Sequence, residues 1–189
     1  MSEAVHHPRF EPKQVVALCL VLALAAGAAP PEARVRSELE ARYDQMAKAF
    51  AARDSATLFE LRTPDFCIHY PGGERDSAVR AHQVLASFFA QSLLPIQVHY
   101  AIRSLSLPGP DVAVVEVFQK GSRYQVLAGK PRLVEYNVKH QETWRRVKGA
   151  WMLASVDDIH DRHRWVDGVS VDPSKPFDPA AKPFQPDRP

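Results

Sequence analysis

The sequence has little cysteine, little net charge and no apolar run long enough to span a bilayer. Only two of its 189 residues are cysteine, which excludes the framework of several disulfides that supports many small secreted domains. The 24 Lys and Arg residues nearly balance the 22 Asp and Glu residues, and they are scattered, so there is no basic stripe of the kind that binds nucleic acid. With 46% hydrophobic residues, the chain is predicted to form one globular domain and not a disordered or fibrous protein.

The longest apolar run, Val15–Ala29, follows basic residues and ends in small ones, as in a secretory signal peptide. Its 15 residues fall short of the roughly 20 that a transmembrane helix needs. We therefore expect residues 1–28 to be a signal peptide, cleaved after Ala28, and the protein to be periplasmic or secreted. The alternative is an uncleaved membrane anchor, which Glu3 and Glu11 favour because they dilute the positive charge before the run.

Helical signals follow this segment. Apolar residues spaced three and four apart over Glu32–Ala52 predict an amphipathic helix. Asp54 or Ser55 can cap a short second helix, because a side-chain oxygen there accepts a bond from a free N–H of the first turn. A strand is expected over residues 66–70, and a third helix over residues 76–92.

After Pro95 the hydrophobic pattern changes to period two, which is typical of half-buried strands. The expected strands are joined by short turns, so they are predicted to pair antiparallel. Helices first and strands afterwards predict an α+β fold, in which the helices pack on one face of a curved sheet.

Proline is concentrated in the last segment, where six of the residues 171–189 are proline and the charges cancel. Proline fixes its own φ and lacks an amide donor. We expect this segment to be a disordered or polyproline-like tail.

Three segments occur in a characteristic order: AFAARDSATLFEL (Ala49–Leu61), PDFCIHYPGG (Pro64–Gly73) and ETWRRVKGAWML (Glu142–Leu153). In this order and spacing the chain, over residues 32–161, resembles the nuclear transport factor 2-like superfamily, in particular its SnoaL-like and ketosteroid-isomerase-like branch. The resemblance implies three N-terminal helices packed on a cone-shaped, strongly curved antiparallel sheet around an apolar pocket. It also implies a homodimer formed through the outer face of the sheet. Because this superfamily includes isomerases, dehydratases, hydrolases and proteins without activity, it does not imply one reaction.

Steroid isomerases of this superfamily carry an aspartate base directly before the proline that ends the first strand. In this chain Tyr70 precedes Pro71, and a tyrosine is a poor base near neutral pH. The helix tyrosine of those enzymes would align with Met46, and Tyr43 lies one turn earlier. We therefore expect Tyr70 to line a pocket and to donate a hydrogen bond.

His140 is the candidate acid or base. Strand alternation places it on the face of Tyr136 and Trp144, so its side chain is predicted to point into the apolar interior. Asp157 and Asp158 lie on opposite faces of the last strand, so about one of them can face the pocket and orient the imidazole. The alternative is a core histidine whose hydrogen bonds are satisfied by a neighbour.

His160 and His163, with the carboxylates beside them, superficially suggest a metal site. A spacing of three suits one face of a helix, but this stretch follows a predicted strand. We expect a charged, solvated end, no metal and no cofactor.

These observations predict an exported domain that binds a small apolar or amphipathic molecule in a cone-shaped pocket, with dehydratase, hydrolase or isomerase-type chemistry. The alternative is a non-catalytic dimeric interaction module with a filled pocket, so the sequence leaves open whether the protein is an enzyme. No nucleic-acid partner is expected, and a membrane would be contacted only through an uncleaved signal segment. The residues predicted to line the pocket are Tyr43, Met46, Phe50, Ile68, Tyr70, Tyr100 and Tyr136.

Overall fold

The computed structural model describes residues 31–185, except for the side chain of Asp161. The predicted signal peptide, residues 1–28, lies outside the described residues. Helices and short strands alternate in the first part, which contains α2 (Pro31–Ala52), α3 (Ser55–Glu60), β1 (Arg62–His69), β2 (Arg75–Ser77) and α4 (Ala78–Gln91). Among these helices, none combines the length and the apolar character that crossing a bilayer requires.

The helices begin where the sequence supplies a cap. Asp54 accepts a hydrogen bond from the amide of Thr57 (3.0 Å) and starts α3, as predicted. Helix α4 begins at Ala78, two residues later than predicted, because Ser77 is its N-cap and accepts from the amide of Arg80 (3.3 Å). The carboxylate of Asp76 instead accepts a hydrogen bond from Tyr70.

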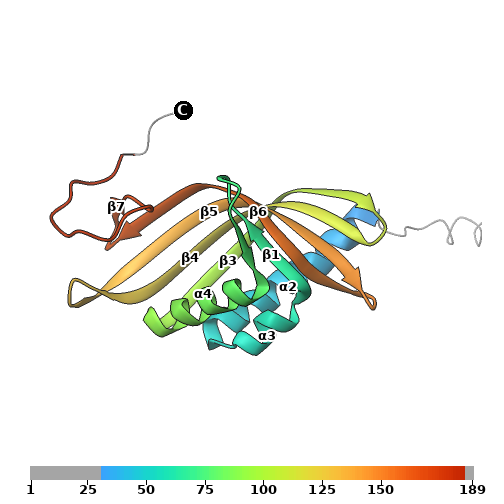
Figure 1. Ribbon diagram of the computed structural model, residues 1–189, viewed down its shortest axis with the longest axis horizontal. Coiled ribbons are helices and arrows are strands. Elements are labelled where there is room, and N and C mark those ends of the chain that lie inside the picture. Colours follow the sequence, from blue (N-terminus) through green and yellow to red (C-terminus); the bar gives the residue numbers. More distant parts are fainter. Residues whose placement is uncertain (1–30, 186–189) are drawn as a thin grey trace, which may run out of the picture. The chain divides into compact units, whose positions relative to one another are not determined.

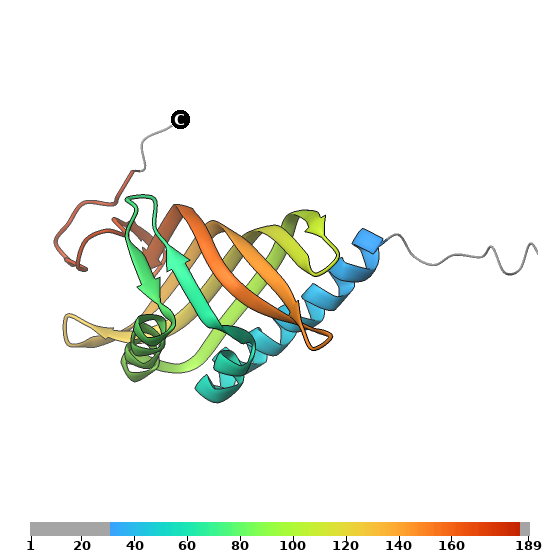
Figure 2. The same ribbon diagram turned by 45° about the vertical axis from the view of Figure 1, so that its right-hand side comes forward.

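Five further strands complete the fold. They are β3 (Ser92–Gly109), β4 (Val112–Leu127), β5 (Lys130–Val147), β6 (Ala150–Val166) and β7 (Val169–Val171). The strand order is β2-β1-β6-β5-β4-β3, with β7 paired to β6. All pairs are antiparallel except β1 with β6, which are parallel. Figures 1 and 2 show a curled sheet with the three helices on one face, so the predicted α+β class is confirmed.

The core lies between the concave face of the sheet and the helices. Helix α2 contributes a buried stripe at helical spacing, which is Val35, Leu39, Tyr43, Met46 and Ala49. The sheet contributes residues that alternate along β4 and β5, because every second side chain of a strand points to the same face. Ala113, Val115 and Val117 of β4 stand opposite Trp144, Glu142 and His140 of β5, and all six are buried.

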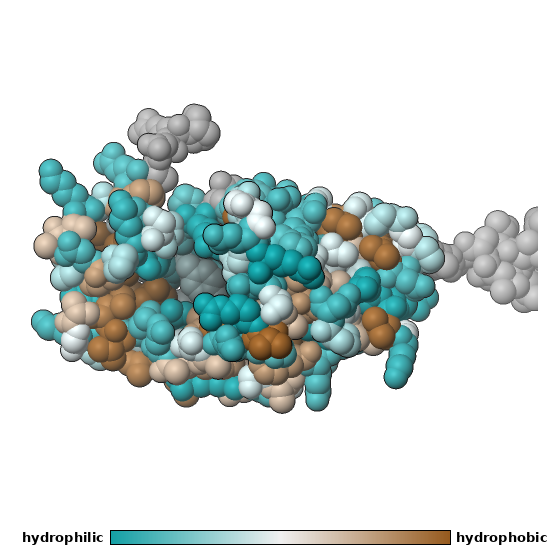
Figure 3. Space-filling model, viewed as in Figure 1, coloured by the Kyte–Doolittle hydropathy of each residue, from teal (hydrophilic) through white to brown (hydrophobic). Residues whose placement is uncertain are grey.

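Apolar side chains are also exposed at one end of the sheet. Leu93 and Leu94 at the start of β3, and Tyr124 and Val126 near the end of β4, are exposed. Leu93 and Tyr124 are register partners. In Figure 3 the apolar surface is densest toward the left, where α4 and the β4–β5 hairpin lie.

The proline-rich segment has a defined course as far as residue 185. Arg164 of β6 donates hydrogen bonds to the carbonyls of Asp172 (3.1 Å) and Lys175 (2.8 Å). The amide of Phe184 donates to the carbonyl of Ser170 (2.9 Å). Residues 172–185 form no helix or strand of their own, and the disordered or polyproline-like tail expected for residues 171–189 stays a prediction. Residues 186–189 lie outside the described part.

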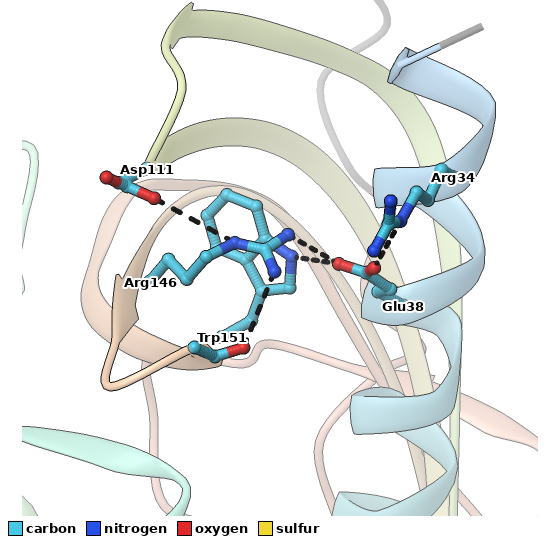
Figure 4. A network of polar contacts seen from close by, with 6 residues as sticks. Arg34, Glu38, Asp111, Arg146 and Trp151 are labelled. Carbon is cyan, nitrogen blue, oxygen red and sulfur yellow. Dashed lines mark hydrogen bonds and ion pairs between the residues drawn. The ribbon is translucent and has the colours of Figure 1, made fainter. Parts of the chain in front are cut away.

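Helix α2 is held to the β5–β6 hairpin by a polar network around Glu38 (Figure 4). One carboxylate oxygen accepts hydrogen bonds from Arg146 Nη2 (2.6 Å) and Trp151 Nε1 (2.8 Å). The other accepts from Arg34 Nε at 3.0 Å. Burial alone would raise the pKa of Glu38, but these donors outweigh it and lower the pKa.

The Glu38 network should stabilise the fold in a pH-dependent way. Because the folded-state pKa of Glu38 is below its unfolded value, its contribution is present above the unfolded pKa and is lost as the pH falls through the folded pKa. We expect Glu38→Gln to lower the free energy of unfolding by about 1 kcal/mol at pH 7, and by less near pH 3. Urea denaturation at both pH values measures this. Glu40→Gln, an exposed position on the same helix, is the control, and an equal loss at both pH values for Glu38→Gln would contradict the prediction.

Candidate functional site

A cavity of about 220 Å³ opens into the concave side of the sheet beside α2. For comparison, an engineered protein cavity of about 150 Å³ is large enough to bind benzene. An apolar wall with a few polar groups is the usual make-up of a small-molecule site. The lining residues are Met46, Phe50, Arg62, Phe66, Ile68, Tyr100, Gln119, Val138, His140, Glu142, Leu153, Val156, Ile159 and Arg162.

His140 and Glu142 form a polar pair at the wall of this cavity. They stand two residues apart on β5, so their side chains share the concave face. His140 Nε2 lies 2.9 Å from Glu142 Oε1, and only 3% of His140 and 2% of Glu142 are exposed. The pair is therefore shielded from bulk water. In such surroundings the interaction between the two side chains is stronger than on an open surface.

The second oxygen of Glu142 is held by two further donors. Tyr43 of α2 donates its hydroxyl to Oε2 at 2.6 Å, and Trp144 donates its indole N–H at 2.8 Å. Burial, followed by the nearby Glu142, raises the pKa of the Tyr43 phenol well above its usual value, so this phenol stays protonated and donates. Oε2 thus accepts two hydrogen bonds, one from α2 and one from β5.

Aromatic packing fixes these donors. The ring of Tyr43 stacks on Tyr100 with centroids 4.9 Å apart and meets Trp144 edge-on at 5.5 Å. Such contacts hold each ring in one orientation. The carboxylate of Glu142 is thus presented to His140 by a rigid support made from α2, β3 and β5.

This arrangement suits proton transfer at His140. With Nε2–H donating to Glu142, the neutral imidazole has its lone pair on Nδ1. Nδ1 makes no hydrogen bond to any group that the structure describes. When Nδ1 takes up a proton, the carboxylate behind Nε2 stabilises the imidazolium, so His140 can act as a base and return the proton as an acid.

Arg62, the first residue of β1, brings a positive charge to the same cavity. Its guanidinium lies 4.5 Å from the ring centroid of Phe66 and 6.0 Å from that of Phe59. Nε and Nη1 are buried, and neither has a hydrogen-bond partner among the described residues. Burial lowers the pKa of Arg62, yet an arginine remains protonated in proteins.

The structure brings most of the predicted pocket residues together. Met46, Phe50, Ile68, Tyr100 and His140 line the cavity, while Tyr43 lies behind Glu142 and supports it.

Two tyrosines lie elsewhere. Tyr70 donates its hydroxyl to Asp76 at 3.0 Å and is not a lining residue. Tyr136 packs across Gly121, where an added Cβ would stand 2.3 Å from its ring, and its hydroxyl accepts from Gln119 at 3.2 Å. Neither tyrosine therefore reaches the predicted pocket.

The predicted partner of His140 needs correction. Asp157 accepts a hydrogen bond from Ser155 Oγ (2.6 Å) and pairs with Nδ1 of His69. Asp158 is exposed and has a positive φ of 48°. The pairing of β5 with β6 shifts register on both sides of Lys139, so simple alternation along β6 does not apply there.

The carboxylate that contacts His140 is Glu142, which the sequence analysis overlooked. The signal was available: strand alternation gives Glu142 the same face as His140 and Trp144. Charged residues are rarely fully buried unless they are paired. For this reason a glutamate within an apolar strand face, such as Glu142, is not expected to point into the core.

The segment after Asp157 belongs to β6. His160 Nδ1 contacts the carbonyl of Asp158, and His163 stacks on Trp165. Among the side chains that the structure describes, no group of three or more His, Cys, Asp or Glu residues has an arrangement that could hold a metal ion.

No family model and no curated protein matches the chain, but solved structures do. Hexachlorocyclohexane dehydrochlorinase (LinA) type 2 matches with a TM-score of 0.57 and 8% identity, over 80% of this chain and 98% of that one. A putative scytalone dehydratase from Novosphingobium aromaticivorans matches with a TM-score of 0.57 and 10% identity, over 70% and 88%. A putative dehydratase of the NTF2-like family from Streptomyces avermitilis matches with a TM-score of 0.52 and 20% identity, over 68% and 96%. At these identities the likeness concerns architecture alone, and the chain has the cone-shaped nuclear transport factor 2-like fold.

Proposed function

We propose that the protein binds a small molecule in the concave cavity and that His140, supported by Glu142, transfers a proton to and from it. The observation that carries this proposal is the 2.9 Å contact between His140 Nε2 and Glu142 Oε1 at the wall of the cavity. A buried imidazole that is backed by a carboxylate is a general acid–base group.

The chemistry that this site suits is removal of a proton from an apolar or amphipathic substrate, followed by elimination or isomerisation, or removal of a proton from a water molecule that hydrolyses such a substrate. Solved proteins of the same fold are named dehydrochlorinase and dehydratase, and we propose the same broad class here. The space of about 220 Å³ supports this proposal over the alternative of an interaction module with a filled pocket.

As a second part of the proposal, two copies of the chain associate as a homodimer through the outer face of the sheet, as the resemblance to the nuclear transport factor 2-like superfamily implies. With the apolar segment Val15–Ala29 read as a signal peptide, we also propose a periplasmic or secreted location.

Exchange of substrate hydrogens with solvent tests the acid–base role without knowledge of the complete reaction. A compound that binds the protein is incubated with it in D₂O, and NMR follows deuterium entering its C–H positions. We expect His140→Gln to slow this exchange by about 100-fold to 10,000-fold, with the dissociation constant changed only a few-fold. His99→Gln, at an exposed position on β3, is the matched control, and unchanged exchange in His140→Gln would remove the acid–base role.

A further inference from the structure

We propose that the ligand of this cavity carries one carboxylate group on an apolar body and that Arg62 is the receptor of that carboxylate. This inference rests on the proposed small-molecule function of the cavity, and it adds the chemical class of the ligand.

The charges that line the cavity are unbalanced. Its lining includes two arginines, the half-buried Arg62 and the exposed Arg162, but only one carboxylate, that of Glu142. Both oxygens of Glu142 are already occupied, Oε1 by His140 and Oε2 by Tyr43 and Trp144. Nε and Nη1 of Arg62 make no hydrogen bond to either of these oxygens.

The hydrogen-bonding capacity of Arg62 is unused. Nε and Nη1 are buried without a partner among the described residues. The rings of Phe66 and Phe59 attract the cation, but they offer no oxygen. Because burying a charge without partners is unfavourable, a guanidinium in such a place is expected to meet an acceptor that the chain itself does not supply.

A carboxylate is the acceptor that best fits this donor. The planar fork of a guanidinium matches the two oxygens of a carboxylate, which it can bind bidentately. Packing against Phe66 at 4.5 Å restricts the orientation of the fork, so less conformational freedom is lost when a ligand binds.

The rest of the cavity limits the body of the ligand. Phe50, Ile68, Val138 and Leu153 give it apolar walls. The volume of about 220 Å³ exceeds the roughly 150 Å³ that hold a benzene ring. An aryl or short alkyl chain with one carboxylate fills such a space.

Matched acids and amides test the proposal. Isothermal titration compares phenylacetate with phenylacetamide, and hexanoate with hexanamide, on the wild-type protein at pH 7. We expect the acids to bind at least tenfold more tightly than the amides, since a hydrogen bond to a charged group exceeds a neutral one by about a factor of ten in affinity. Arg62→Met should remove this preference, because it weakens the binding of the acids far more than that of the amides.

Two variants keep the test decisive. Arg103→Met removes another arginine that packs on an aromatic ring, Phe118 at 5.1 Å, but at an exposed position outside the cavity, and it should keep the preference for acids. Arg62→Lys keeps the charge without the fork and should give an intermediate preference. Thermal melting of Arg62→Met should give a Tm no lower than that of the wild type, since methionine retains the packing of the side-chain stem and removes a buried charge.

The outcomes separate the two proposals. If acids and amides bind the wild type equally well, or if Arg62→Met keeps the preference for acids, the carboxylate proposal is wrong and small-molecule binding stands. If none of the four compounds binds, the carboxylate proposal is wrong and the proposed function loses its support as well.

Discussion

Replacing Glu142 by alanine is expected to lower the free energy of unfolding by about 3–5 kcal/mol, because three buried donors lose their acceptor at a cost of about 1–3 kcal/mol each. The substitution leaves the hydroxyl of Tyr43, the indole N–H of Trp144 and Nε2 of His140 without their common acceptor. Each buried donor then loses its partner in a place that water does not reach. Urea denaturation at pH 7, followed by circular dichroism, measures the loss.

Two variants separate loss of the acceptor from loss of volume. Glu142→Gln keeps the shape and one acceptor oxygen but turns an NH₂ group toward donors, so we expect about half the loss of the alanine variant. Glu116→Ala removes a half-exposed carboxylate on the neighbouring strand, 3.4 Å from Lys139, and should cost no more than about 1 kcal/mol. A loss in Glu142→Ala as small as that in Glu116→Ala would show that the carboxylate does not organise the core.

Leu39→Ala is expected to destabilise the fold by about 2–5 kcal/mol. Leu39 is fully buried, with 0% exposure, and belongs to the buried stripe of α2. Its removal leaves a cavity that the neighbouring side chains fill only in part. Tyr43 lies one turn further along the same face, so the loosened helix should also present its hydroxyl to Glu142 less firmly. Guanidinium denaturation measures the first effect, and ligand titration the second.

Val79→Ala provides the comparison for Leu39→Ala. Val79 lies on α4 and is 67% exposed, so shortening it should change stability by no more than about 0.5 kcal/mol. Equal losses in the two variants would mean that α2 does not pack through this face.

The parts of the fold that the sequence predicts are those with a local cause. The apolar stripe of α2 recurs every three or four residues, and the side of β5 that His140 occupies follows from alternation along a single strand. Both patterns depend on backbone geometry within one element, so a reader of the sequence can apply them without knowing the partners.

The parts that the sequence misses depend on contacts between distant segments. Nothing adjacent to Arg62 marks it as buried, because its burial arises when β1 lies beside β6 and Phe66 packs under the guanidinium. That Asp157 does not reach His140 depends on register shifts between β5 and β6, which no local pattern encodes, whereas the place of Glu142 beside His140 follows from alternation along β5.

The parallel pairing of β1 with β6 has a consequence for how the chain folds. Arg62 pairs with Leu153, and the amide of Leu153 donates to the carbonyl of Leu61 at 2.8 Å. The chain between β1 and β6 forms a long loop, and closing it costs conformational entropy before the contacts of the two strands can compensate for it. Folding therefore slows as such distant pairings increase. During synthesis β1 leaves the ribosome long before β6, so the wall that carries Arg62 is completed only when almost all of the domain is available. We therefore expect the β3–β4 and β5–β6 hairpins to form early and the cavity to close last.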